Sequence, residues 1–224
     1  MSRNQPDHFL RLLKTSPSGA VFNPWWQIDE EHDIDPQGAA IRRKHLAVYF
    51  RERLGKAGLA LVGEALGYRG GHFSGIPMTS ERMLLHRQQQ ILVGVKPRRT
   101  SKPSVCPNGF SEPTATIVWG TLLKIGMVPD EFVLWNAFPW HSFDPHCGML
   151  SNRTPNESER STGLPVLKAF LELFSCDQVV ALGKIAAAQL EELNVNAHCI
   201  RHPASGGAKL FRQQITVLVH RARD

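Results

Sequence analysis

Leu59-Ala60-Leu61-Val62 opens the stretch of sequence that decides the fold, and a glycine-rich segment follows it directly. An extended chain with this sequence is apolar on both faces, which is typical of a strand buried inside a parallel sheet. Three further short apolar runs have the same character; they are Phe132-Val133-Leu134-Trp135, Gln178-Val179-Val180-Ala181-Leu182 and His198-Cys199-Ile200. The sequence therefore predicts four buried strands.

Patterns typical of helices fill the intervals between these strands. We predict helices over residues 37–54, 79–91, 112–126, 163–174, 184–193 and 207–221. In the last of them the β-branched run Ile215-Thr216-Val217-Leu218-Val219 would also suit a strand, although we prefer a helix. Strands that alternate with helices predict an α/β fold, in which a parallel sheet carries helices on both faces.

Length and charge narrow the class of protein. The 224 residues fit one domain, which we expect to span residues 1–224. The formal net charge of +6 favours a polyanionic partner such as nucleic acid, although a merely basic soluble protein is the alternative. No apolar run approaches the length of a membrane span, and no secretory segment follows Met1. We therefore expect a cytoplasmic protein without membrane association.

The four cysteines do not form a recognisable site. They are Cys106, Cys147, Cys176 and Cys199, and none belongs to a C-x-x-C pair. In a cytoplasmic protein they are expected to be reduced thiols. Histidines such as His141 and His146 lie near Cys147 but lack zinc spacing, so we expect no bound metal and no cofactor.

Ligands of parallel α/β sheets bind at the carboxyl ends of the strands, so the residues that follow each strand matter most. Residues 63–75 follow the first strand and begin with Gly63 and Glu64. The segment contains five glycines, counting Gly63, and these let the backbone approach a ligand closely. The segment lacks the motifs of a phosphate-binding loop. A flexible surface loop is the alternative interpretation.

Asn136 and His202 follow two other strands. The amide of Asn136 offers a donor beside an acceptor, which matches a pyrimidine edge carrying a carbonyl beside an N–H, although asparagine is also common in turns. His202 ends a strand and precedes Pro203 and a glycine-rich turn; such a histidine is either structural or functional. Under the predicted topology, Glu64, Asn136 and His202 converge on one edge of the sheet.

The order and spacing of these motifs, from about residue 58 to residue 210, resemble the uracil-DNA glycosylase superfamily. The first motif, Gly63-Glu64-Ala65-Leu66-Gly67, is most similar to that of its iron–sulfur branch. The resemblance implies a three-layer α/β/α sandwich around a four-stranded parallel sheet. It also implies a monomeric, monofunctional glycosylase that flips uracil out of single- or double-stranded DNA and hydrolyses its N-glycosidic bond, leaving an abasic site.

The resemblance assigns roles to individual positions. Phe73 would stack on the extruded base, Asn136 would read the uracil edge, and His202 would stabilise negative charge on uracil O2. Gly63, Ala65 and Gly67 would line the same pocket. The resemblance and the basic run at residues 96–102 together give the predicted DNA contacts, which are Arg69, Arg98, Arg99, Arg201, Ser205 and Gly206.

Three departures from the family pattern leave questions open. The scattered cysteines predict no iron–sulfur cluster. Ala65 replaces the aspartate that positions water in the best-known branch; Glu64 is the nearest substitute, with Glu81 and Asp144 as weaker ones. Gly67 replaces the tyrosine that excludes thymine there. Two alternatives therefore stand beside uracil excision, namely a glycosylase for another deaminated or mismatched base and a lesion-binding protein with little turnover.

Overall fold

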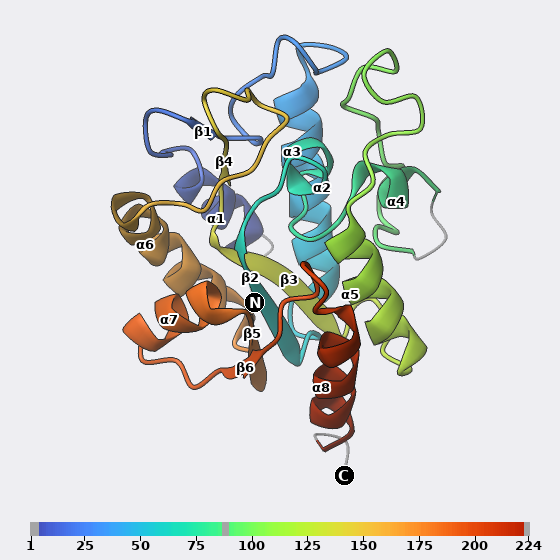
Figure 1. The fold of residues 1–224 in the computed structure, drawn as a ribbon. Helices are drawn as coiled ribbons and strands as arrows, with labels where there is room; N and C mark the ends of the chain where they lie inside the picture. Colours follow the sequence, from blue (N-terminus) through green and yellow to red (C-terminus); the bar gives the residue numbers. More distant parts are fainter. Residues whose placement is uncertain (1–4, 87–89, 222–224) are drawn as a thin grey trace.

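A sheet of four parallel strands forms the centre of the molecule (Figure 1). The computed structural model describes residues 5–86 and 90–221. In spatial order the strands are β3 (Phe132–Phe138), β2 (Leu59–Ala65), β5 (Gln178–Leu182) and β6 (His198–Ile200). Leu59 pairs with Phe132 on one side and with Gln178 on the other, so β2 is buried between two neighbours. The prediction of four parallel strands is confirmed, but β6 is an edge strand whose His198 and Cys199 are exposed rather than buried.

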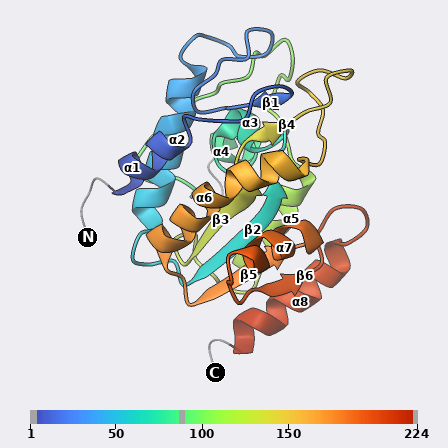
Figure 2. The same cartoon turned by 90° about the vertical axis from the view of Figure 1, so that its left-hand side faces the viewer.

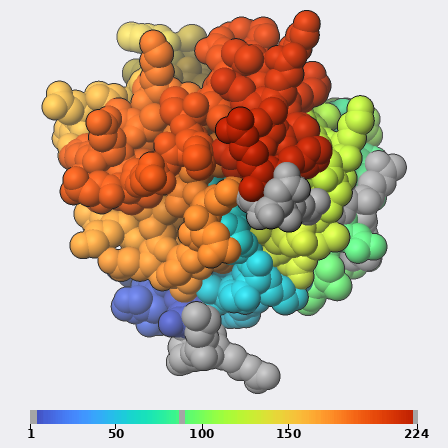
Figure 3. Space-filling model, turned by 90° about the horizontal axis from the view of Figure 1, so that it is seen from below, coloured from blue at the N-terminus to red at the C-terminus, as the bar shows by residue number. Residues whose placement is uncertain are grey.

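Helices cover both faces of this sheet, as Figure 2 shows from the side. They are α1 (Gln5–Leu12), α2 (Gly38–Arg53), α3 (Gly71–Ser74), α4 (Glu81–His86), α5 (Pro113–Lys124), α6 (Glu157–Phe174), α7 (Lys184–Glu192) and α8 (Ala208–Arg221). Helices α6 and α7 pack on one face, while α5 and α8 lie side by side on the other (Figures 2 and 3). The predicted three-layer α/β/α sandwich is confirmed. None of the helices in the described residues has the length and apolarity that crossing a membrane requires.

An aromatic cluster on one face of β3 ties the N-terminal helices to the sheet. Trp135 is fully buried, and its ring contacts those of Phe9 from α1, Phe50 from α2 and Phe170 from α6. Trp25 is also fully buried and stacks on Trp135 at 6.0 Å between ring centroids. Each of these side chains contributes roughly 1.5–3 kcal/mol through burial, so the cluster is a major part of the core.

Helix α2 closes the free edge of the sheet along β3. The Tyr49 hydroxyl accepts a hydrogen bond from the backbone N–H of Leu134 at 2.9 Å, and Arg53 Nε donates to the carbonyl oxygen of Phe132 at 3.1 Å. Backbone groups of an edge strand that would otherwise have no strand partner are thereby satisfied. The same contacts fix β3, and therefore Asn136 at its far end.

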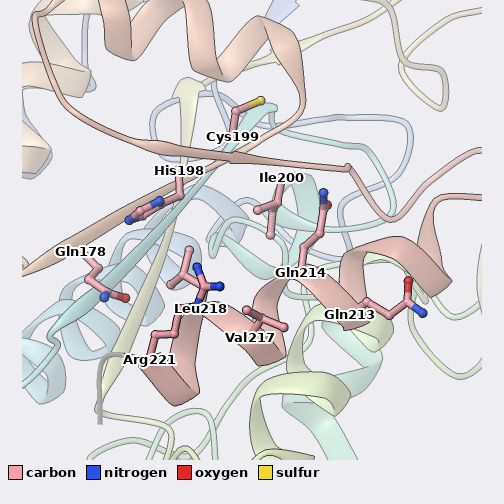
Figure 4. Close-up of a pocket in the computed structure, with 9 residues that line it drawn as sticks. All are labelled: Gln178, His198, Cys199, Ile200, Gln213, Gln214, Val217, Leu218 and Arg221. Carbon is pink, nitrogen blue, oxygen red and sulfur yellow. The ribbon is translucent and has the colours of Figure 1, made fainter. Parts of the chain in front are cut away.

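The other edge of the sheet, β6, packs against α8 and leaves a cavity of about 430 Å³ (Figure 4). Gln178 and Ile200 contribute from the strands, while Gln214 and Leu218 contribute from α8. Gln178 is the first residue of β5, so the cavity extends toward the amino ends of the strands, away from the edge where Asn136 lies.

Several element boundaries differ from the prediction. Strands β2 and β3 are longer, so Glu64, Ala65 and Asn136 lie within strands rather than after them. Helix α6 begins at Glu157 instead of residue 163, because Asn156 and Glu159 form a reciprocal capping box. The predicted helix 79–91 is shorter, since α4 ends at His86; residues 87–89 lie outside the described part of the chain, and residues 90 and 91 are not helical.

Two additional strands were not predicted. β1 (Val21–Phe22) and β4 (His141–Ser142) form a small antiparallel ladder near the carboxyl ends of the central strands. Each has only two residues, too few for an alternating pattern to be visible in the sequence. The ladder joins the N-terminal segment to the chain that leaves β3, and so borders the region of the site.

Candidate active site

A cleft of about 500 Å³ opens at the carboxyl ends of the central strands. Glu64 comes from β2, Asn136 from β3, and His202 from the turn after β6. The structure therefore brings together the three side chains whose convergence the sequence predicted. The remaining residues that line the cleft are Gly63, Ala65, Leu66, Gly67, Met78, Glu112, Thr114, Asn152, Arg153, Thr154, Ala204 and Ser205.

Asn136 is held in one place by the strand register. It pairs with Gly63 across the sheet, is 2% exposed, and lies so close that a Cβ at position 63 would be 2.6 Å from its side-chain amide. The amide also lies 3.2 Å from both the carbonyl oxygen of Trp135 and the backbone nitrogen of Leu66. A donor facing the carbonyl and an acceptor facing the N–H satisfy both contacts. Gly63 is thus the residue that makes room for the asparagine.

His202 is held as a neutral imidazole with a defined tautomer. Its Nδ1 accepts a hydrogen bond from the backbone N–H of Ala204 at 3.1 Å, so the proton of the neutral ring is on Nε2. Burial lowers the pKa of His202 below its usual value, and the nearby charge of Arg201 lowers it further. At neutral pH the side chain therefore carries an Nε2–H donor without a positive charge.

The turn after His202 is fixed by contacts on both sides. Arg201 donates from its backbone N–H to the Gln214 side chain of α8 at 2.7 Å and from its guanidinium to the carbonyl oxygen of Ser205 at 3.3 Å. Ser205 and Gly206 adopt left-handed backbone conformations, with φ of 50° and 77°, and both are exposed. Ser205 lines the cleft, so the predicted contact of this turn with DNA has a suitable location.

Phe73, the residue predicted to stack on the base, is packed inside the protein. Its ring is fully buried, does not line the cleft, and stacks on Phe110 at 4.4 Å between centroids with 2° between the planes. His72 contacts the same ring at 4.3 Å. The parallel partner of Phe73 is therefore another aromatic side chain. Stacking of Phe73 on a base stays a prediction.

The three carboxylates considered for positioning water have different surroundings. Glu64 is half-buried and lines the cleft. Glu81 is buried and accepts hydrogen bonds from the backbone N–H groups of Thr100 and Ser101 at 2.7 and 2.9 Å, so it has a structural role outside the cleft. Asp144 accepts from the backbone of its own turn and does not line the cleft. Of these three carboxylates, Glu64 alone lines the cleft.

Glu112 is a cleft residue that the sequence did not single out. Its Oε2 atom is buried without a hydrogen-bond partner among the residues that the structure describes, and burial raises the pKa of the carboxyl to about 7. In the sequence it is one acidic residue ahead of Pro113 at the start of a predicted helix, a position where glutamate is ordinary. No local pattern could reveal that it packs against the turn that follows β2.

The predicted DNA-contacting arginines lie outside the cleft. Arg69 is exposed and donates to the Tyr68 hydroxyl at 2.8 Å. Arg98 forms an exposed ion pair with Asp35 at 3.7 Å, and Arg99 donates to the carbonyl oxygen of Pro107 at 2.7 Å. The exposed pair of Arg98 contributes little stability, whereas the half-buried Arg99 also donates to the carbonyl oxygens of Ser101 and Cys106. Contact of these arginines with DNA stays a prediction.

The potential metal-binding residues are dispersed. Cys106 and Cys147 lie in loops, Cys176 follows α6, and Cys199 lies in β6; all are free thiols. Within residues 5–86 and 90–221, no group of three or more histidine, cysteine or acidic side chains is arranged to hold a metal ion.

Comparisons with known proteins identify the family and the fold. The family model described as the uracil DNA glycosylase superfamily matches residues 53–223. The crystal structure of wild-type Pedobacter heparinus SMUG2 has the same fold, with a TM-score of 0.66 and 13% sequence identity over 98% of each chain. No curated protein sequence matches the chain. Since the family model covers most of its length, the chain belongs to the uracil DNA glycosylase superfamily.

Proposed function

We propose that this protein is a DNA glycosylase that removes uracil from DNA by hydrolysing its N-glycosidic bond. The observation that carries the proposal is that the Asn136 amide and the neutral imidazole of His202 line the same cleft. The first side chain offers a donor and an acceptor at a fixed position, and the second offers a donor without charge. A pyrimidine with carbonyl and N–H groups on its edge is complementary to this set.

The chemistry follows from the charge that develops as the bond breaks. The base must first leave the helical stack, at a cost of a few kcal/mol, because its sugar carbon is otherwise inaccessible. Bond cleavage then gives an anionic base and a cationic sugar. A preorganised N–H donor such as Nε2 of His202 stabilises the negative charge, and removal of one such donor typically lowers a rate by about a hundred- to a thousandfold.

Recognition of the base rests on the asparagine. The amide of Asn136 is anchored between Trp135 and Leu66, so it keeps its orientation while a base enters. Substitution by alanine removes both hydrogen-bonding groups at once. We expect Asn136→Ala to lower uracil excision by about a hundredfold, with little change for DNA binding outside the cleft. Asn196→Ala is the matched control, because Asn196 is exposed in the loop before β6.

The test is an excision assay on a panel of duplexes that contain uracil, hypoxanthine, xanthine or a G·T mismatch, with abasic sites detected by alkaline cleavage. The proposal expects abasic sites at uracil. Excision confined to another base would favour a glycosylase of different range, an option that the small Gly67 residue leaves open. Tight binding to uracil-containing DNA without new abasic sites would favour a lesion-binding protein and would refute the proposal.

A further inference from the structure

Glu112 occupies space that two glycines of the neighbouring turn leave open. It is the N-cap residue of α5, yet its side chain makes no capping hydrogen bond to that helix. A Cβ on Gly70 would lie 2.5 Å from its Oε2 atom, and a Cβ on Gly67 would lie 3.0 Å from Oε1. The carboxyl group is thus packed against the turn after β2, with Oε1 beside the cleft residue Gly67 and Oε2 against Gly70, which lies outside the cleft lining.

The buried oxygen of this carboxyl has an unfilled hydrogen-bonding capacity. Although Glu112 as a residue is half-buried, Oε2 is inaccessible and has no hydrogen-bond partner in the described part of the chain. Buried polar atoms in native proteins nearly always have a partner, so an exception at a binding cleft calls for an explanation. A protonated carboxyl leaves less unmet hydrogen-bonding capacity at this site than an ionised one. Because Oε2 lies against Gly70, the oxygen that a ligand in the cleft would meet is Oε1, which lies beside the cleft residue Gly67.

We propose that Glu112 acts as a protonated carboxylic acid and donates a hydrogen bond to a carbonyl oxygen of the extruded base. This inference rests on the proposed function, since it assumes that a base enters the cleft. It assigns Glu112 a part in selecting a base that carries a carbonyl, and a part in stabilising that base as it departs.

The electrostatics of the reaction favour the protonated form. Burial raises the pKa of Glu112 from 4.5 to about 7, so the neutral acid is well populated near neutral pH. A base that fills the cleft excludes more water and raises the pKa further. As the glycosidic bond breaks, the base becomes anionic; an ionised carboxylate beside it would oppose the reaction, whereas an O–H donor stabilises the charge.

Charged neighbours do not account for the shifted pKa, because burial is its only cause. The titratable or charged side chains that line the cleft together with Glu112 are Glu64 of β2, Arg153 of the loop before α6, and His202. The guanidinium of Arg153 pairs with Glu159 at 2.6 Å. His202 is already neutral near pH 7 because its pKa is lowered.

The experiment is a single-turnover excision profile between about pH 6 and pH 9 on a single-stranded uracil oligonucleotide, for the wild type, Glu112→Gln and Glu112→Ala. The wild-type rate constant should fall as pH rises through a midpoint at or above about 7. Glu112→Gln should keep the rate at pH 6 within a few-fold and lose this decline, because its amide donates without titrating. Glu112→Ala should be slower than the wild type by roughly tenfold or more at pH 6. The difference should disappear as the pH rises above the midpoint, because the wild-type carboxyl is then ionised and no longer donates. Glu172→Gln on the exposed face of α6 is the control.

The outcomes separate the two proposals. If the wild type excises uracil but Glu112→Gln keeps the same decline at high pH, or if Glu112→Ala has the wild-type rate at pH 6, the role of Glu112 is refuted and the proposed function stands. A rate that rises through this pH range and is lost in Glu112→Gln would assign an ionised carboxylate to water activation, and would also refute the inference. Absence of uracil excision by the wild type at every pH would overturn both.

Discussion

Gly63→Ala provides a sharp test of how the fold positions the base-reading asparagine. The added Cβ would lie 2.6 Å from the Asn136 amide, well inside the 3.4 Å at which ordinary van der Waals contact begins. Gly63 lies inside β2, paired with Asn136, so the backbone cannot retreat without disturbing the sheet. The amide must therefore rotate away from Trp135 and Leu66, the two groups that orient it.

The size of the effect follows from the contacts that are lost. A misplaced amide forfeits its hydrogen bonds to the base, and about 1.5–3 kcal/mol of transition-state stabilisation corresponds to a roughly 10- to 150-fold slower reaction. The assay is single-turnover uracil excision, with thermal unfolding measured in parallel to confirm that the variant is folded. We expect the rate to fall by this factor while the free energy of unfolding decreases by only about 1–3 kcal/mol.

Gly120→Ala is the matched control for this substitution. Gly120 lies in α5, and a Cβ there would have nothing within 4 Å. The control should excise uracil at the wild-type rate and be more stable by about 0.5–1 kcal/mol, because alanine is the better helix former. Wild-type excision by Gly63→Ala would refute the idea that this glycine makes room for Asn136.

Two further predictions concern stability. Burial lowers the pKa of His72 to about 3 and that of His141 to about 4, so both resist protonation that the unfolded chain undergoes near 6.5. The stability that the two neutral histidines contribute is present above pH 6.5 and is lost as the pH falls below it. Between pH 7 and pH 5 the free energy of unfolding, measured by chemical denaturation, should drop by about 2 kcal/mol per histidine. A free energy of unfolding that does not change over this range would contradict the prediction. Asn156→Ala removes the capping box of α6 and should lower the free energy of unfolding by about 1 kcal/mol, which corresponds to a decrease in Tm of about 2–4 °C. The control Ser158→Ala changes an exposed residue of the same helix and should leave Tm unchanged. Equal Tm values for the two variants would contradict the cap assignment.

The central sheet was predictable because its strands are apolar on both faces. Leu59 to Val62 and Phe132 to Trp135 are buried throughout, which is the pattern that a parallel strand produces in a sequence. The convergence of Glu64, Asn136 and His202 followed from the rule that parallel strands present their carboxyl ends at one edge. These are properties of local sequence combined with a general topological rule.

The features that escaped prediction depend on contacts between distant segments. Phe110 stacks on Phe73 across 37 positions of chain, and Glu112 packs against Gly67 and Gly70 from the start of another helix. In each case the contact joins two side chains or a side chain and a glycine that are far apart in the sequence. No periodic pattern in the sequence indicates such a contact. The stacking of Phe73 on an extruded base stays a prediction.

Single-turnover uracil excision by His202→Ala, compared with the wild type at pH 7, tests the central claim most directly. The fixed tautomer places the proton on Nε2, and the lowered pKa keeps the ring neutral, so the variant loses the donor that stabilises the departing base. The predicted result is a rate at least about a hundredfold lower, with an unchanged unfolding transition. Excision within a few-fold of the wild-type rate would contradict the assignment of His202 and, with it, the proposed chemistry of the cleft.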